Sequence, residues 1–597
     1  MTTKKILLFT FFSSIFLYSE PISPINSFDK NLLSLEKNET KKTVKENNQT
    51  EDTSSKIDEI SIKLEKTLTK KSALLHDIHH KKFIKRFYRQ NNYTPLWITQ
   101  KGLEKRVSEL FKAINSDITL GSKSQIIQQY QHIEQYIKNK NSEKNKIHIE
   151  LKLSVLYFDF LQHRLYGSIK WRQFASRLKK LRKKGVGGHW IKHKPPYSLS
   201  ELMLKPNILE TMNQITPKYF GYKGLLKSLQ KLQTMELKGG WEKLPIFKKL
   251  ELGDQGVNVI SLRKRLKISG DLKECKLTAQ KLFEKDTIEE TEDSIKFQPD
   301  ATFDVCLADA VKKFQLRHGL TTDGIVGVGT IKALNISVEA KIETVLLNLD
   351  RIKWLPRELD ERYLVVNIPE YMLHYMESGQ DKQNIKVIVG DTRHPTPIFG
   401  EEISYIVLNP YWKIPEGIVR REIIPAMIRN PNYIRKQGLE IRTTWYERSP
   451  RVHPQDIYWE QYRYGAVKFP YRIMQAPGKK NALGKIKFKF PNRFAVYLHD
   501  TPTRHLFKRD KRAFSHGCIR VDEPTTLLKT IASFNKSINL KKAMKTLKGK
   551  RKTQLNISNR IHVHIIYLTA GFDNNTAELQ FRNDIYGYDA IQKKEKH

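Results

Sequence analysis

The sequence is poor in cysteine and has no long apolar run. Its 597 residues include three cysteines, Cys275, Cys306 and Cys518, and no two of them stand at the short spacing of a zinc site. The pair His79-His80 has no partner pair at ligand spacing either. Beyond the first 19 residues, no segment reaches the ~20 consecutive apolar residues of a membrane-spanning helix. We therefore expect no metal centre and no internal membrane span.

Acidic residues are scarce relative to basic ones. The chain has 63 Asp and Glu against 106 Lys and Arg, which gives a formal net charge of +43. Such a charge attracts polyanions. However, the lysines are spread along the whole chain and no nucleic-acid-binding motif is present, so we do not expect nucleic acid as a partner. Apolar residues make up 39% of the chain, enough for a core in each of the three or four domains that this length predicts.

The odd number of cysteines predicts one free thiol in an oxidising compartment. Cys275 and Cys306 share one candidate domain, whereas Cys518 lies in a histidine-rich stretch far away. Our hypothesis is a disulfide between Cys275 and Cys306 that leaves Cys518 free.

The start of the chain resembles an export signal. Residues 1–19 carry Lys4 and Lys5 ahead of a mostly apolar run from Ile6 to Tyr18, which is short for a membrane span and suits a secretory signal. The residues before Glu20 lack the small side chain normal for cleavage, so an uncleaved membrane anchor is the alternative. We expect an exported protein of the periplasm or cell envelope, with any membrane contact confined to this segment.

The pattern then changes along the chain. Residues 20–71 are polar and predict a flexible linker with a short helix near 57–68. Residues 72–249 have helical periodicity, as in the apolar set at 103, 107, 110, 111 and 114. Residues 250–335 predict two further helices around turns, and 341–597 contain β-rich runs at 363–368, 385–389, 403–408, 494–499, 560–569 and 579–581. The fold class is therefore multidomain α+β.

The most informative stretch is Tyr497 to Val521, which contains Ser-His-Gly-Cys-Ile-Arg-Val at 515–521. A thiol attacks carbonyls as the thiolate, and a nearby imidazole is its usual activator. If 518–521 is extended, Ile519 and Val521 face the core while Cys518 and Arg520 face a cleft. A helix is expected after Asp522.

This stretch resembles the catalytic signature of the YkuD-type L,D-transpeptidases, which cross-link peptidoglycan. Residues 72–249 are similar to the helical scaffold domain of the YcbB-like branch, and 250–335 to a small α-helical peptidoglycan-binding module. Residues 341–597 would then form the mostly β catalytic domain, with a capping subdomain inserted at 417–485. An insertion at 271–299 departs from the module's compact form, so this region would either bind glycan or only position the catalytic domain.

The resemblance implies a role for each site residue. Cys518 would be the nucleophile, His499 the general base, and His516 a residue that lines the site. Gly517 would let the backbone approach the substrate closely, and the Cys518 N–H and Tyr497 would donate to the oxyanion. Arg520 would bind a carboxylate of the peptide stem. Asn409 and Trp412 would lie at the mouth of the cleft. No cofactor or metal is implied.

The implied reaction is acyl transfer from a tetrapeptide stem through a cysteine thioester to an amine, which gives a 3-3 cross-link. The acceptor amine is left open and includes an amine of an outer-membrane protein. The alternatives are an L,D-carboxypeptidase that uses water to trim stems, and a wall-binding protein without catalysis.

Overall fold

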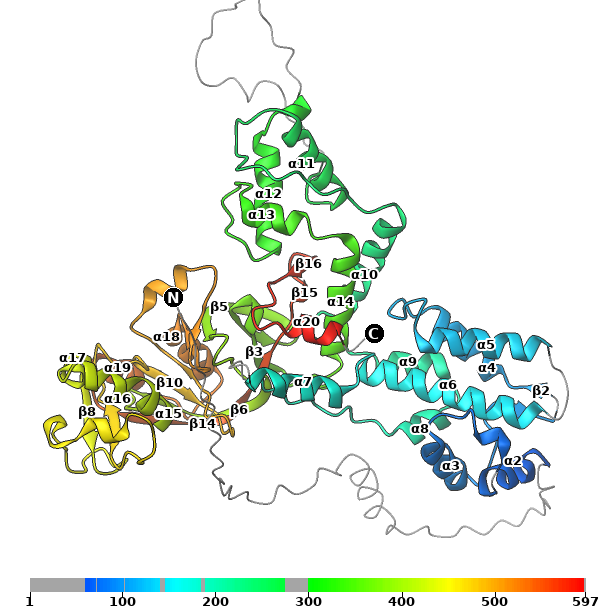
Figure 1. The fold of residues 1–597 in the computed structure, drawn as a ribbon, viewed down its shortest axis with the longest axis horizontal. Helices are drawn as coiled ribbons and strands as arrows, with labels where there is room; N and C mark the ends of the chain where they lie inside the picture. The colour runs from blue at the N-terminus through cyan, green and yellow to red at the C-terminus, as the bar shows by residue number, and fades with distance from the viewer. Residues whose placement is uncertain are drawn as a thin grey trace, which may run out of the picture. The chain divides into compact units, whose positions relative to one another are not determined.

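The computed structural model describes residues 59–70, 72–100, 102–139, 145–183, 188–273 and 299–594. The predicted signal or anchor at 1–19 and the linker up to residue 58 lie outside the described residues. Among the described helices, none has the length and hydropathy needed for a membrane span. Helices dominate the first half of the chain and strands the second (Figure 1). The predicted α+β class is confirmed.

The N-terminal helices share one hydrophobic core. Helix α6 (Lys146–Tyr166) lies in its middle and is buried on nearly all sides, whereas α4 (Lys105–Asn115) buries a single face with Val107, Leu110 and Ile114. The other helices of this core are α2 (Glu59–Thr69), α3 (Lys81–Gln90), α5 (Gln125–Asn139), α8 (Leu199–Leu204) and α9 (Ile208–Ile215).

Two details of the sequence prediction change here. Helix α2 is the short helix predicted within the linker, and its Ile60, Leu64 and Leu68 pack into the helical core. Leu103 was expected on the face of the following helix, but it lies in a short hairpin strand before α4 and is 46% exposed. Glu104 N–H bonds to the Trp97 carbonyl and closes this hairpin, so the helix begins two residues later than the apolar pattern suggests.

The next helices form two smaller cores. Helix α10 (Tyr222–Leu237) packs along α14 (Val338–Ile352). The helices that lie between these two in the sequence form the second core. They are α11 (Val257–Ile268), α12 (Val305–Arg317) and α13 (Val328–Leu334), and they surround Leu262, Leu307 and Phe314. Gly319 follows α12 with φ of +63°, as expected of a residue that ends a helix in the left-handed region.

The cysteines differ as the sequence analysis expected. Cys306 in α12 is disulfide-bonded, and Cys518 is free. The predicted partner, Cys275, lies outside the described residues, so the pairing with Cys275 stays a prediction.

A nine-stranded sheet carries the C-terminal half. Its strand order is β12-β5-β13-β11-β10-β6-β14-β3-β4, and β4 also pairs with β5, which closes the sheet on itself. The strands are β3 (Arg362–Asn367), β4 (Met372–Glu377), β5 (Gln380–Gly390), β6 (Phe399–Leu408), β10 (Ile486–Lys489), β11 (Leu498–His499), β12 (Ala513–Ser515), β13 (Ile519–Val521) and β14 (Thr553–Ile566).

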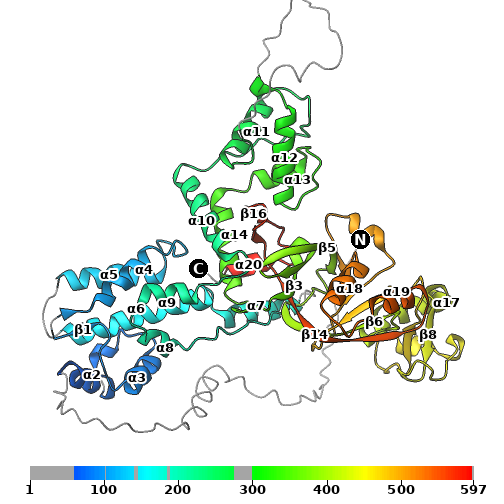
Figure 2. The same ribbon diagram turned by 180° about the vertical axis from the view of Figure 1, so that it is seen from behind.

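Helices cover the apolar interior of this sheet. Helix α18 (Pro524–Ser533) begins at a proline and buries Leu527, Leu528 and Ile531, as predicted after the signature. Helices α19 (Leu540–Lys548), α7 (Trp171–Lys183) and α20 (Tyr588–Lys593) add residues to the same core. Both ribbon views show α18 and α19 beside the sheet (Figure 2).

The predicted strand at 494–499 is too long. The observed strand β11 spans Leu498–His499, because the Asn492 side chain accepts from the main-chain N–H groups of Phe494 and Val496 and closes a turn there. Ala495 within this turn has φ of +55°, which interrupts an extended chain.

An insertion between β6 and β10 forms a core of its own, with Ile414, Ile424 and Ile473 at its centre. Its strands β7 (Trp412–Lys413), β9 (Arg472–Gln475) and β8 (Leu439–Arg442) form a separate sheet in that order. Its helical parts are α15 (Glu416–Ile418), a π-helical turn η6 (Val419–Ile423), α16 (Ile424–Arg429) and α17 (Tyr433–Gln437). We name this insertion, residues 409–485, the cap.

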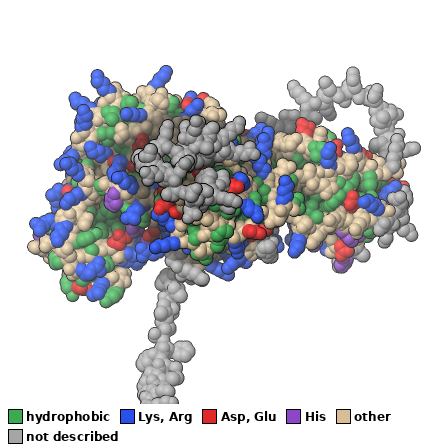
Figure 3. Space-filling view, turned by 90° about the horizontal axis from the view of Figure 1, so that it is seen from above, with side chains coloured by type: hydrophobic (Ala, Val, Ile, Leu, Met, Phe, Trp, Pro, Cys, Tyr) green, Lys and Arg blue, Asp and Glu red, His purple; other side chains and the backbone are tan. Residues whose placement is uncertain are grey.

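Basic side chains are distributed rather than gathered. Figure 3 shows Lys and Arg scattered over the visible face, with acidic groups between them. The net charge therefore does not form a single nucleic-acid-type stripe on this face.

The helical core contains a buried carboxylate whose ionisation should limit stability. Glu150 is fully buried and accepts from the N–H of Leu96 and Trp97 and from the Tyr88 hydroxyl. Burial raises its pKa to about 7, whereas an unfolded glutamate titrates near 4.5.

We predict that ionisation of Glu150 destabilises the helical core as the pH rises from about 4.5 to about 7. Glu150→Gln removes this cost, so from pH 5 to pH 8 its stability relative to wild type should improve by about 2.5 kcal/mol. Hydrogen exchange of α6 amides, corrected for intrinsic rates, measures the effect. Glu134→Gln on α5 is the control, and an unchanged difference for Glu150→Gln would contradict the prediction.

Candidate active site

Three neighbouring strands place a row of polar side chains on one face of the sheet. Antiparallel pairing of β10 with β11 sets Lys487 opposite His499, and parallel pairing of β11 with β13 sets His499 opposite Arg520. Side chains alternate along a strand, so Cys518, two positions before Arg520, projects to the same face. Tyr497 is likewise two positions before His499.

The opposite face is held by the core. Leu498, Ile519 and Val521 have no exposed surface and lie in the largest hydrophobic cluster of the protein's described part. Because these three side chains point inward, the alternate residues face outward, as the sequence pattern predicted for Cys518 and Arg520. His499 nonetheless remains only 4% exposed, and Cys518 is half-buried.

The loop before Cys518 is fixed by two hydroxyl groups. The Ser515 hydroxyl accepts from Gly517 N–H and donates to the Cys518 carbonyl, and the Thr396 hydroxyl donates to the Gly517 carbonyl. Gly517 has φ of +105°, a conformation that side chains rarely adopt. Within the described residues the Cys518 N–H has no hydrogen-bond partner.

His499 has a defined tautomer. Its Nδ1 lies 2.5 Å from the main-chain oxygen of Asp500, which can only accept, so Nδ1 carries the proton and donates. The Nε2 atom is then unprotonated and available as a base. The Asp500 carboxylate is engaged elsewhere, with Lys485 N–H, Thr501 N–H and the Arg504 guanidinium, so it is not the partner of the imidazole.

Burial keeps the thiol and the imidazole neutral. It raises the pKa of Cys518, although hydrogen bonds from Tyr497 and the charges of Lys487 and Lys489 act in the opposite direction. Burial, together with the nearby charges of Arg520 and Lys487, lowers the pKa of His499 to about 3. The resting site therefore holds a thiol and a neutral imidazole rather than a preformed ion pair.

His516 faces away from the sheet and meets the cap. Its Nε2 is 2.7 Å from the carboxylate of Glu422 in η6, and its ring centroid is 4.6 Å from that of His394. This contact joins the residue before Gly517 to the inserted subdomain. Its role in lining the site stays a prediction.

Arg520 has no carboxylate partner among the described residues. Its Nη1 donates to the Thr503 hydroxyl at 3.2 Å, and burial lowers the pKa of its guanidinium. The structural ion pair that would occupy this side chain is thus absent from the described part of the chain, which leaves donors for a bound anion.

Asn409 and Trp412 are not brought to the thiol by any described contact. The Asn409 amide donates to the carbonyls of Thr546 and Arg551, so it ties the end of β6 to the last turn of α19 and to the segment after it. Trp412 lies in β7 and packs against the cap core. That either residue binds substrate remains only a prediction from the family resemblance.

The sequence analysis missed Lys487 and Lys489. Both lie on β10, where they alternate with the buried Ile486 and Phe488, and the Lys487 Nζ is 3.7 Å from the centroid of the Tyr497 ring. Burial lowers the pKa of Lys487 to about 8, assisted by the charge of Lys489. The alternation Ile-Lys-Phe-Lys predicts that both lysines share a face, but only the pairing with β11 reveals which residues they meet.

Comparison with known families agrees with this architecture. Residues 361–547 match the family of the "L,D-transpeptidase catalytic domain", residues 82–229 match the "Scaffold domain", and residues 255–334 match the "Putative peptidoglycan binding domain".

Among curated proteins, the chain is 35% identical over 270 residues to a "Putative L,D-transpeptidase" of Haemophilus influenzae. This match covers 44% of the chain and 50% of the relative, so the chain spans about half the length of the relative that it matches.

Solved structures with detectable similarity include two L,D-transpeptidases. The Xylanimonas cellulosilytica protein is 14% identical, covers 54% of this chain and 98% of its own, and has a TM-score of 0.17. The Stackebrandtia nassauensis protein is 15% identical, covers 53% of this chain and 94% of its own, and has a TM-score of 0.18.

The order of the matched regions completes the comparison. The scaffold region precedes the peptidoglycan-binding region, which precedes the catalytic region. The chain therefore carries a YkuD-type L,D-transpeptidase catalytic domain together with a scaffold domain and a peptidoglycan-binding domain, an arrangement consistent with the YcbB-like architecture.

Proposed function

We propose that the chain is an exported cysteine L,D-transpeptidase that forms 3-3 cross-links in peptidoglycan. The observation that carries this proposal is the hydrogen bond from His499 Nδ1 to the Asp500 carbonyl. It leaves the Nε2 of a buried imidazole as a proton acceptor on the same sheet face as the free thiol of Cys518. A thiol and an unprotonated imidazole on one face supply the two groups that nucleophilic acyl transfer requires.

The proposed reaction uses these groups in two acyl-transfer steps. The Cys518 sulfur attacks the carbonyl of the third stem residue, and its proton passes to His499 Nε2. The tetrahedral oxyanion accepts from the Cys518 N–H and the Tyr497 hydroxyl, and its collapse expels D-alanine, which takes the proton from His499. The amine of a second stem then attacks the thioester, and its proton returns through His499 to the sulfur.

The negative charge of a bound substrate can raise the basicity of the His499 imidazole. Burial and, to a smaller extent, the Arg520 and Lys487 charges depress the pKa of His499, so a protonated imidazole is costly while the site is empty. A stem carboxylate bound to Arg520 neutralises one of these charges. In this proposal the imidazole becomes a stronger base when donor substrate is bound. While the site is empty, Cys518 stays a neutral thiol and reacts slowly.

The peptidoglycan-binding region and the cap have supporting roles in this proposal. The peptidoglycan-binding region would hold the enzyme on the wall, and the cap, joined to His516 through Glu422, would exclude water from the thioester. Exclusion of water favours an amine as acceptor. That amine belongs to another stem in our proposal, with an outer-membrane protein as a possible alternative.

We predict that a carbapenem acylates the wild-type protein once and Cys518→Ala not at all. Cys306 is disulfide-bonded and should not react. His499→Gln should slow acylation by about 10²–10⁴-fold, the range for loss of a general base. Intact mass spectrometry over time measures these rates, with the exposed His505→Gln as the histidine control. Equal acylation of Cys518→Ala would disprove the nucleophile assignment.

The acceptor is tested with tetrapeptide muropeptides. We expect wild type to yield cross-linked dimers with release of D-alanine, because the cap excludes water. Separation of the products by mass decides the result, and tripeptides without dimers would show the carboxypeptidase alternative instead. A wall-binding protein without catalysis would give neither product.

Lys487 should lower the pKa of the Cys518 thiol and so raise its reactivity. Its charge lowers the pKa of Cys518, so Lys487→Met should raise that pKa further and slow iodoacetamide alkylation at pH 7.5 roughly threefold, by the loss of one nearby charge. The alkylation rate rises with pH in both proteins, and the variant's profile should lie at higher pH. Lys479→Met, on the cap surface, is the matched control. Superimposed profiles for wild type and Lys487→Met would refute this role.

A further inference from the structure

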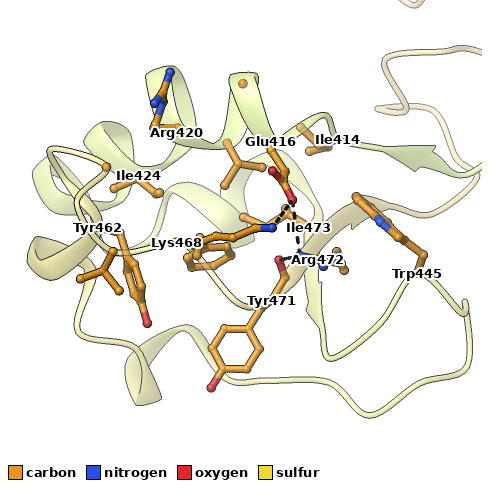
Figure 4. Close-up of a pocket in the computed structure, with 15 residues that line it drawn as sticks. Ile414, Glu416, Arg420, Ile424, Trp445, Tyr462, Lys468, Tyr471, Arg472 and Ile473 are labelled. Carbon is orange, nitrogen blue, oxygen red and sulfur yellow. Dashed lines mark hydrogen bonds and ion pairs between the residues drawn. The ribbon is translucent and has the colours of Figure 1, made fainter. Parts of the chain in front are cut away.

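The cap contains a cavity of about 350 Å³, within the range of ~300–1,000 Å³ typical of ligand pockets. Its floor is apolar, with Ile414, Ile424 and Ile473 almost fully buried. Figure 4 shows aromatic rings of Tyr462, Tyr471 and Trp445 around this floor. The cavity is thus shaped for a small group with an aliphatic part.

The rim of the cavity is cationic. It carries Arg420, Lys468 and Arg472 against a single carboxylate, Glu416. Glu416 Oε1 is 3.9 Å from both the Lys468 Nζ and the Arg472 Nη1, as the dashed lines of Figure 4 show. Direct charge-assisted hydrogen bonds are shorter, at ~2.7–2.9 Å, so Glu416 does not saturate the donors of these two side chains.

Arg420 adds a further unused cation. In the described part of the chain it has no ion-pair partner, and it packs against Gly465 at the cavity edge. Three cations with one loosely held carboxylate leave a net positive rim over an apolar floor. This combination favours a ligand that presents a carboxylate beside a methyl or methylene group.

The cavity wall is joined to the catalytic loop. Val419 and Arg420 line the cavity from η6, and Glu422 of the same turn pairs with His516. A π-helical turn is uncommon, and such turns concentrate at functional sites. A group bound in the cavity therefore contacts the segment that reaches the residue before Gly517.

We propose that this cavity is a second binding site for the peptide stem of peptidoglycan, distinct from the donor position at Cys518. The stem alternates methyl-bearing residues with free carboxylates, which matches the apolar floor and the cationic rim. The proposal rests on the proposed function for the class of ligand, and it places a neighbouring stem on the cap.

The test is calorimetric titration of the full-length Cys518→Ala protein, so that binding is measured without acyl transfer. The probe is the soluble tripeptide stem, which lacks the terminal D-alanine. A second titration uses the same stem with its carboxylates amidated, and a third uses a neutral N-acetylglucosamine trimer. We expect binding of the free stem and loss of the cavity component with both probes that lack a carboxylate.

Single charge changes then locate the site. In the Cys518→Ala background, Lys468→Met and Arg420→Met should each weaken the cavity component about five-fold, an exposed charge contact of modest strength. Glu416→Gln should strengthen it, because it removes the competing carboxylate. Lys479→Met makes the same charge change on the cap surface outside the cavity and should have no effect.

The outcomes separate this proposal from the proposed function. Equal binding by Lys468→Met, Arg420→Met and Lys479→Met would overturn the cavity site, even if Cys518 is acylated normally. Equal binding of the neutral trimer or the amidated stem would overturn the carboxylate assignment. The cavity could bind the stem with the expected charge dependence while the wild-type thiol is not acylated by carbapenem. This result would support the cavity site and reject the proposed transpeptidase activity.

Discussion

The candidate site depends on the burial of Leu498, Ile519 and Val521. These side chains fix the faces of β11 and β13, and the parallel pairing of the two strands then aligns His499 with Arg520 and brings Cys518 to the same surface. A slip of one residue in either strand would send these polar groups into the apolar core. The chemistry is therefore specified by aliphatic packing, although no aliphatic residue takes part in it.

Burial has a second effect on this surface, because it disfavours charge on both reacting groups. The thiol pKa rises and the imidazole pKa falls, while the neighbouring lysines and Arg520 favour the thiolate and oppose the imidazolium. The two groups thus need a proton transfer coupled to attack rather than a standing ion pair. Cations around this half-buried thiol would also suit the anionic stem of the proposed reaction, in which recognition and activation draw on the same charges.

Local patterns predicted much of this arrangement. The alternation at 518–521 predicted which residues face the core, and the proline after Glu523 predicted where α18 begins. The turn at Asn492 shortened β11 relative to the prediction, because side-chain hydrogen bonds to the backbone outweighed an apolar run. Lys487 and Glu422 could not be found in this way, since each meets the site only through strand pairing or through the folded cap.

The central claim is that the Cys518 sulfur carries the stem as a thioester. The direct measurement is acid quenching of the wild-type protein within its first turnover of tetrapeptide stem, followed by digestion and peptide mass mapping. We predict a tripeptidyl adduct on the peptide that contains Cys518, formed with one equivalent of D-alanine. Release of D-alanine with no adduct on that peptide, or with the adduct on another residue, would contradict it.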